Sequence, residues 1–92
     1  MKVDQEDNGT KGRFFVKEGD EIAGEMTYTW AGNDRIIIDH TEVNDAFRGK
    51  RVGFEMVKNA VEFARAKGIS IIPLCPFAKS VFNKFPEFND VL

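Results

Sequence analysis

The sequence predicts a small α/β fold, and three patterns in it lead to that class. Apolar and polar residues alternate through much of the first half, which is the periodicity of half-buried strands. Apolar residues then recur at helical spacing over residues 51–67, and a short apolar run follows over residues 69–74. The 92 residues are enough for one domain with one core. The order of these patterns indicates a minimal core: a three-stranded antiparallel meander, a crossover helix, a parallel fourth strand and a short C-terminal helix.

The first half supplies the predicted meander. Residues 1–11 are polar and are expected to form a flexible N-terminus, which leaves residues 12–92 as a single domain. Strands are predicted at residues 12–17, 21–30 and 35–43. Because only short turns join these segments, neighbouring strands should pair antiparallel.

The second half supplies the helices and the last strand. A loop over residues 44–50 leads into the helix over residues 51–67, whose predicted buried stripe comprises Val52, Met56, Val57, Ala60, Val61 and Ala64. Gly68 suits the left-handed residue that often ends a helix. A helix between two strands of one sheet makes a right-handed crossover, so residues 69–74 should run parallel to the third strand. Pro76 suits the first position of a helix, so a short helix is predicted over residues 77–84.

The charge of the chain is unevenly distributed. Residues 1–46 carry 11 acids and 5 bases, whereas residues 47–92 carry 8 bases and 4 acids. This asymmetry favours an anionic ligand bound by the second half, the alternative being a solvated surface without a ligand. The formal net charge of −2 and the absence of interleaved aromatic and basic residues argue against nucleic acid as a partner.

Composition excludes further classes of protein. No apolar run approaches the length of a membrane span, so no membrane partner is expected. The single cysteine excludes an intrachain disulfide, and no signal peptide opens the chain, so we expect a cytoplasmic protein. One histidine and one cysteine are too few for a zinc site, and no metal cofactor is expected.

The most informative segment is Arg48-Gly49-Lys50-Arg51-Val52-Gly53, between the third strand and the long helix. The start of a helix offers unpaired backbone N–H groups and the positive end of the helix dipole, so this segment predicts an anion site. It is not a Walker loop, because Arg51 follows Lys50 in place of serine or threonine. It also lacks the third glycine of a dinucleotide fingerprint.

This segment resembles the acyl-CoA signature of the GNAT acetyltransferases, Arg/Gln-x-x-Gly-x-Gly/Ala. Arg48 fills the first position and Gly53 the last, whereas Arg51 stands where glycine is usual. Four separated pieces further resemble the very small YjdJ-like branch of that superfamily: His40-Thr41-x-Val43, Phe47-Arg48-Gly49-Lys50, Ile71-Ile72-Pro73-x-Cys75-Pro76-Phe77 and Phe85-Pro86-Glu87-Phe88. The resemblance implies a trimmed GNAT-like core that binds acetyl-CoA and moves its acetyl group to an amine. A CoA-binding module without turnover and a protein-interaction adaptor remain the alternatives.

The same resemblance implies a set of cofactor-binding residues. The backbone of the turn would hold the pyrophosphate, cationic side chains would add charge, and the N–H near Val43 would polarise the thioester carbonyl. Two polar residues lie three apart on the short helix and are candidates for contacts with pantetheine or phosphate, or else plain surface residues. The full set is Val43, Arg48, Gly49, Lys50, Arg51, Val52, Gly53, Ser80 and Asn83.

Three residues are candidates for catalysis. Cys75 lies between a strand end and a helix start, which favours a thiolate, and the resemblance to the YjdJ-like branch implies that it lies near the acetyl thioester. It is therefore either a proton donor or an acetyl acceptor, or else a small buried apolar residue. His40 is either a general base for the amine or a structural residue, and strict alternation places it on one strand face with Ile36, Ile38 and Glu42. Glu42 would serve as the base through a water molecule.

Overall fold

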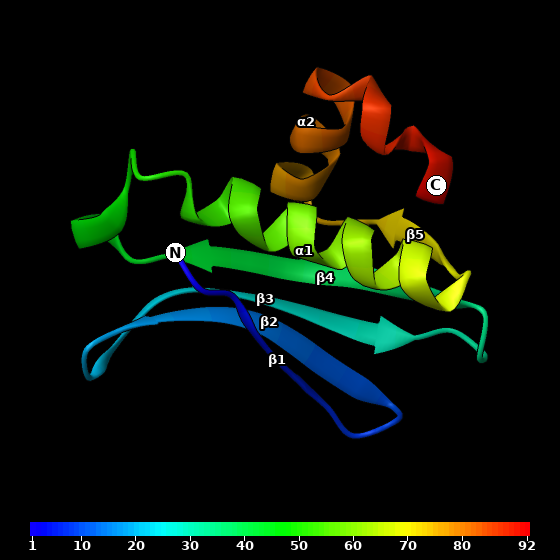
Figure 1. Ribbon diagram of the computed structural model, residues 1–92, viewed down its shortest axis with the longest axis horizontal. Coiled ribbons are helices and arrows are strands. Elements are labelled where there is room, and N and C mark those ends of the chain that lie inside the picture. Colours follow the sequence, from blue (N-terminus) through cyan, green and yellow to red (C-terminus); the bar gives the residue numbers. More distant parts are fainter.

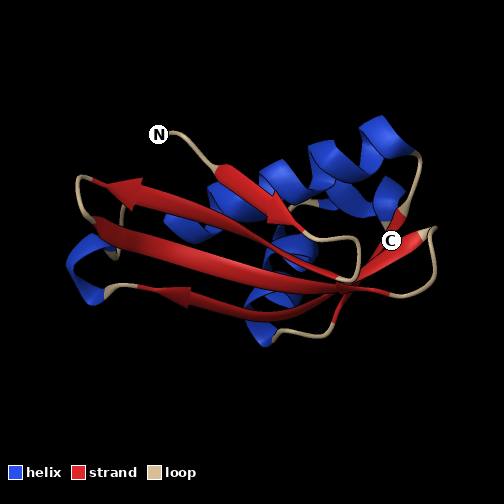
Figure 2. Cartoon of the chain, turned by 90° about the horizontal axis from the view of Figure 1, so that it is seen from below, coloured by secondary structure: helices blue, strands red, loops and turns tan.

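The computed structural model describes residues 1–92 as one mixed sheet with helices on one of its faces (Figure 1). The strands are β1 (Asp4–Asp7), β2 (Lys11–Glu18), β3 (Glu21–Trp30), β4 (Arg35–Val43) and β5 (Ser70–Pro73). The helices are η1 (Asp45–Phe47), α1 (Val52–Lys67), α2 (Pro76–Lys84) and η2 (Pro86–Val91). The strands lie in the order β1-β2-β3-β4-β5, antiparallel throughout except for the parallel pair β4 and β5. The other face of the sheet carries no helix (Figure 2).

The predicted α/β class, crossover helix, parallel last strand and terminal helix are confirmed. The meander, however, has four strands and not three, because residues 4–7 pair with β2 inside the segment expected to be a flexible terminus. This strand is held by polar contacts: Asp7 accepts hydrogen bonds from the Tyr28 hydroxyl (2.6 Å) and from Trp30 Nε1 (2.9 Å), and Gln5 Nε2 donates to the Tyr28 oxygen (2.8 Å). Because side-chain hydrogen bonds and not apolar burial hold this strand, its residues show no apolar alternation, and the hydropathy pattern does not predict it.

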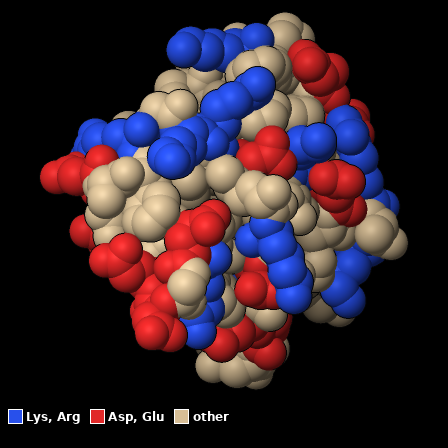
Figure 3. All heavy atoms as spheres, turned by 60° about the vertical axis from the view of Figure 1, so that its left-hand side comes forward, with Lys and Arg blue, Asp and Glu red and all other residues tan.

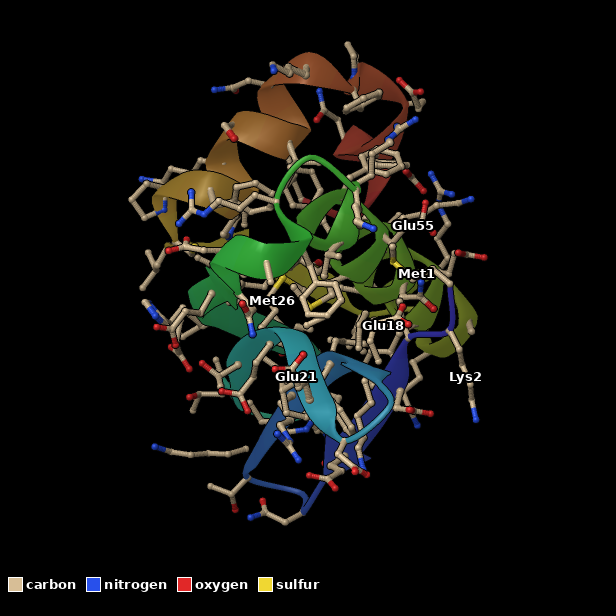
Figure 4. The ribbon with its side chains drawn as sticks, turned by 90° about the vertical axis from the view of Figure 1, so that its left-hand side faces the viewer. Met1, Lys2, Glu18, Glu21, Met26 and Glu55 are labelled. Carbon is tan, nitrogen blue, oxygen red and sulfur yellow. The ribbon has the colours of Figure 1, made fainter.

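The core lies between the sheet and α1. All six residues of the stripe predicted for the helix are buried: Val52, Met56, Val57, Ala60, Val61 and Ala64. They meet the inner face of the sheet, where Met26, Tyr28, Ile36 and Ile38 have no solvent exposure. In Figure 4 Met26 lies inside the molecule, whereas Glu18 and Glu21 stand at the exposed end of the β2–β3 hairpin. None of the helices is both long and apolar enough to span a membrane.

An irregularity in β4 changes which side chains face the core. His40 and Ile38 pair with consecutive residues of β3, so Asp39 is an extra residue without a partner. One extra residue reverses the alternation of the strand beyond it. His40 and Glu42 therefore lie on the helix-free face, with side chains 69% and 79% exposed, while Thr41 turns toward the helices. The prediction that His40 shares a face with Ile38 is wrong for this reason.

Candidate functional site

The turn before α1 has the backbone that an anion site needs. Asn44 caps η1 by accepting a hydrogen bond from the Ala46 N–H (2.9 Å), and the chain then turns through Gly49, whose φ is +82°. Arg51 is the residue before α1 and adopts a left-handed conformation, with φ 64° and ψ 24°. No side chain caps this helix, so the N–H groups of its first turn are open to a ligand.

A cavity of about 580 Å³ opens beside this turn. Its walls are the end of β4, the turn, the first residues of α1 and one face of α2. Three cationic residues line it and no acidic residue does; the lining comprises Thr41, Val43, Phe47, Arg48, Gly49, Arg51, Val52, Gly53, Phe54, Phe77, Ser80, Val81, Lys84 and Phe85. Figure 3 shows a related separation of charge, with mostly Lys and Arg over the helices and Asp and Glu gathered toward the sheet at the lower left.

Gly53 allows α1 and α2 to approach closely at the mouth of this cavity. A Cβ at Gly53 would collide with the ring of Phe77, which packs directly over the glycine. Phe77 in turn forms part of the cavity wall and remains 39% exposed. Glycine at this position therefore leaves room for the Phe77 ring where it now lies.

The cavity reaches the last part of β4, where Thr41 and Val43 line it, beyond the point at which β4 and β5 diverge. Their parallel pairing ends at Ile38 and Pro73, and beyond it the N–H groups of Leu74 and Cys75 both donate to the Ile38 carbonyl (3.2 Å each). β4 continues to Val43 without a neighbour on this side.

The open edge of β4 presents a backbone donor. The N–H of Asn44 donates to Ala23 of β3 (2.9 Å). N–H groups alternate in direction along a strand, so the N–H of Val43 points away from β3 and into the gap. The donor predicted near Val43 would be this N–H group.

Cys75 lies against this gap but is buried, with 4% of its surface exposed. Its Sγ is 3.3 Å from the Thr41 hydroxyl oxygen. Burial raises the pKa of the Cys75 thiol, but its hydrogen bond with the Thr41 hydroxyl and hydrogen bonds from the backbone N–H groups of Ala78, Phe77 and Thr41 outweigh burial and hold that pKa below its usual value. Cys75 does not line the cavity; Thr41 stands between the two.

A second cavity, of about 640 Å³, shares Thr41, Val43 and Arg48 with the first. It is acidic, because Glu25, Glu42 and Asp45 line it. Glu25 and Glu42 are direct cross-strand partners, and His40 Nε2 lies 4.0 Å from a Glu42 carboxylate oxygen. Two cavities of opposite charge thus meet at the free end of β4.

The structure brings seven of the nine predicted cofactor-binding residues together around the first cavity: Val43, Arg48, Gly49, Arg51, Val52, Gly53 and Ser80. Lys50 and Asn83 do not line it. Of the three catalytic candidates, Glu42 lines the second cavity, while His40 and Cys75 reach the site only through Glu42 and Thr41.

Several lining residues were not predicted from the sequence. They are Thr41, Val81, Lys84 and the aromatic residues Phe47, Phe54, Phe77 and Phe85. Lys84 had a usable signal, since it follows the predicted Ser80 by four residues and so shares its helix face. The structure brings no group of three or more His, Cys, Asp or Glu side chains together as metal ligands.

Comparisons with known proteins relate the chain to acetyltransferases. A family model described as GCN5-related N-acetyl-transferase matches residues 13–91. The NMR solution structure of a GCN5-like candidate N-acetyltransferase from Staphylococcus aureus is 36% identical, with a TM-score of 0.73 over 98% of this chain and 85% of that one. The crystal structure of nourseothricin acetyltransferase is 28% identical with a TM-score of 0.57, over 71% of this chain and 40% of that protein. No curated protein matches the chain.

Proposed function

The chain belongs to the GCN5-related N-acetyltransferase family. We propose that it binds acetyl-CoA in the first cavity, which lies between the end of β4, α1 and α2 and is called the helix-side cavity below, and that it transfers the acetyl group to an amine. The observation that carries this proposal is the cavity itself: it is free of acidic residues, it contains a turn of open N–H groups at a helix start, and it reaches the free edge of β4. A ligand with phosphates at one end and a carbonyl at the other suits this arrangement. We further propose that the chain belongs to the small YjdJ-like branch of the family.

In the proposed complex the pyrophosphate lies on the backbone of the turn from Gly49 to Gly53, where the helix dipole favours negative charge. The pantetheine arm follows the apolar wall past Phe77 toward the gap between β4 and β5. The thioester carbonyl accepts a hydrogen bond from the N–H of Val43, which stabilises the oxyanion that forms during attack.

The acceptor amine enters from the acidic second cavity, on the other side of β4. Glu42 lies in that cavity and takes a proton from the amine through a water molecule, or His40 beside it does so. The amine nitrogen attacks the carbonyl carbon, and the carbon–sulfur bond then breaks. The departing CoA thiolate receives its proton from Cys75, relayed by the Thr41 hydroxyl that separates them. The alternative role of Cys75 is to accept the acetyl group itself before the amine does.

Ligand binding and turnover test separate parts of the proposal. Acetyl-CoA should raise the melting temperature and shift the amide signals of residues 49–53, whereas adenosine should do neither, because a ligand bound only by the folded state stabilises it. If millimolar acetyl-CoA moves neither readout, the cofactor assignment is wrong. A panel of amines with acetyl-CoA then separates an enzyme from a CoA-binding module, since the module binds without releasing free CoA thiol.

A further inference from the structure

The cationic residues of the helix-side cavity differ in whether they form an ion pair with a carboxylate. Arg48 forms an ion pair with Asp45 three residues earlier, so part of its charge is already compensated. Arg51 and Lys84 line the same cavity and have no carboxylate partner. The cavity therefore holds two uncompensated positive charges and no negative one.

These two residues approach from different elements. Arg51 stands immediately before α1, and its guanidinium lies over the ring of Phe54, 4.3 Å from the ring centroid, which holds it at the cavity wall. Lys84 is the last residue of α2 and stands one turn beyond Ser80. α2 starts at Pro76, beside the gap between β4 and β5, so Lys84 lies about 12 Å along the helix from that gap at 1.5 Å per residue. Lys84 therefore lies at the end of α2 that is remote from the proposed thioester. Arg51 lies on the same side, because the Phe54 ring beneath its guanidinium packs against the ring of Phe85, the residue after Lys84, with the ring centroids 4.8 Å apart.

We propose that Arg51 and Lys84 bind the 3′-phosphate of CoA and thereby make this protein select CoA over dephospho-CoA; this inference rests on the proposed function. The pyrophosphate is already served by the backbone N–H groups of the turn. The 3′-phosphate is a monoester that carries close to two negative charges at neutral pH, so a pair of cations matches it. Each charge-assisted hydrogen bond lost would weaken binding by about tenfold or more.

The test compares CoA with dephospho-CoA, which differ only in this phosphate. Calorimetric titration of the wild-type protein at low salt should give an affinity for CoA at least about tenfold above that for dephospho-CoA. Lys84→Gln and Arg51→Gln should each reduce the affinity for CoA by about tenfold and leave the affinity for dephospho-CoA unchanged. Lys79→Gln is the matched control, because Lys79 lies on α2 and outside the cavity, and it should change neither affinity.

Salt provides a second readout. The affinity for CoA should fall more steeply with salt in the wild-type protein than in Lys84→Gln, and the two proteins should show the same slope with dephospho-CoA. Equal binding of both ligands by the wild-type protein would overturn the inference and leave the proposed function standing. Failure of both ligands to bind would overturn the proposed function as well.

Discussion

Arg51 combines a strained backbone with a useful side chain, and two substitutions separate the two effects. It is the only non-glycine residue with a positive φ, and this conformation costs an L-residue about 1–2 kcal/mol. Arg51→Gly removes that cost but adds about 0.4–1 kcal/mol of conformational entropy to the unfolded chain. It also loses the contact of the guanidinium with Phe54, which at an exposed site contributes about 0.5–1 kcal/mol. These terms nearly cancel, so we expect Arg51→Gly to keep the stability of the wild-type protein.

Arg51→Ala is the matched comparison, because it loses the same contact and keeps the strain. We therefore expect it to be less stable than Arg51→Gly by about 1 kcal/mol, which is the cost of the left-handed backbone minus the entropy that glycine adds to the unfolded chain. For a domain of this size such a difference corresponds to a separation of about 4–8 °C in melting temperature.

Urea unfolding followed by the fluorescence of Trp30, with a common m-value, measures this difference directly. If Arg51→Ala is as stable as Arg51→Gly, the left-handed backbone at this position is not strained and the reasoning fails. The same two proteins test the side chain in binding: both should bind acetyl-CoA more weakly and with a flatter salt dependence. Unchanged affinity and unchanged salt slope in Arg51→Gly would show that the turn needs only its backbone.

Three further substitutions or measurements probe the site and the fold. Gly53→Ala should displace the Phe77 ring, which lines the cavity, and weaken CoA binding by about tenfold; an unchanged affinity would contradict the packing argument. The alkylation rate of Cys75 should rise with pH about a midpoint below that of a free cysteine and should slow when acetyl-CoA is added; a thiol that ligand does not protect lies away from the thioester. Hydrogen bonds from Tyr28 and other donors outweigh burial and lower the pKa of Asp7, so its charged form contributes stability above the unfolded pKa of about 3.9 that is lost as the pH falls through the folded pKa. Asp7→Asn should lower stability near pH 7 by about 1 kcal/mol and remove this part of the acid dependence, which urea unfolding at pH 7 and pH 3 would measure.

The parts of the fold that sequence predicts are those whose signal is contained in one segment. The stripe of α1 repeats over four turns, and the α1 end at Gly68 has its left-handed residue, with φ 68°. The strand at residues 4–7 has no such signal, since its contacts reach Tyr28 and Trp30 across the sheet. The orientation of His40 fails for a related reason: the extra residue at Asp39 belongs to the pairing of two strands, and neither strand alone reveals it.

The candidate site divides in the same way. The turn from Arg48 to Gly53 can be predicted from the sequence, because its glycines, its cationic residues and the start of the helix are adjacent. Lys84 and the aromatic wall depend on how α2 lies against α1, where Phe77 packs over Gly53. A tertiary contact of this kind has no local pattern.

The location of the site follows from two interruptions of the sheet. At Pro73 the parallel ladder of β4 and β5 ends, and proline has no N–H to continue it. At Asp39 the extra residue reverses the alternation of β4, so that Thr41 turns toward the helices and lines both cavities, while Glu42 lines only the acidic one. Without the first interruption β5 would cover the N–H of Val43; without the second, Thr41 and Glu42 would exchange faces. The same few residues therefore open the edge of the strand and place Thr41 and Glu42 on opposite faces of it.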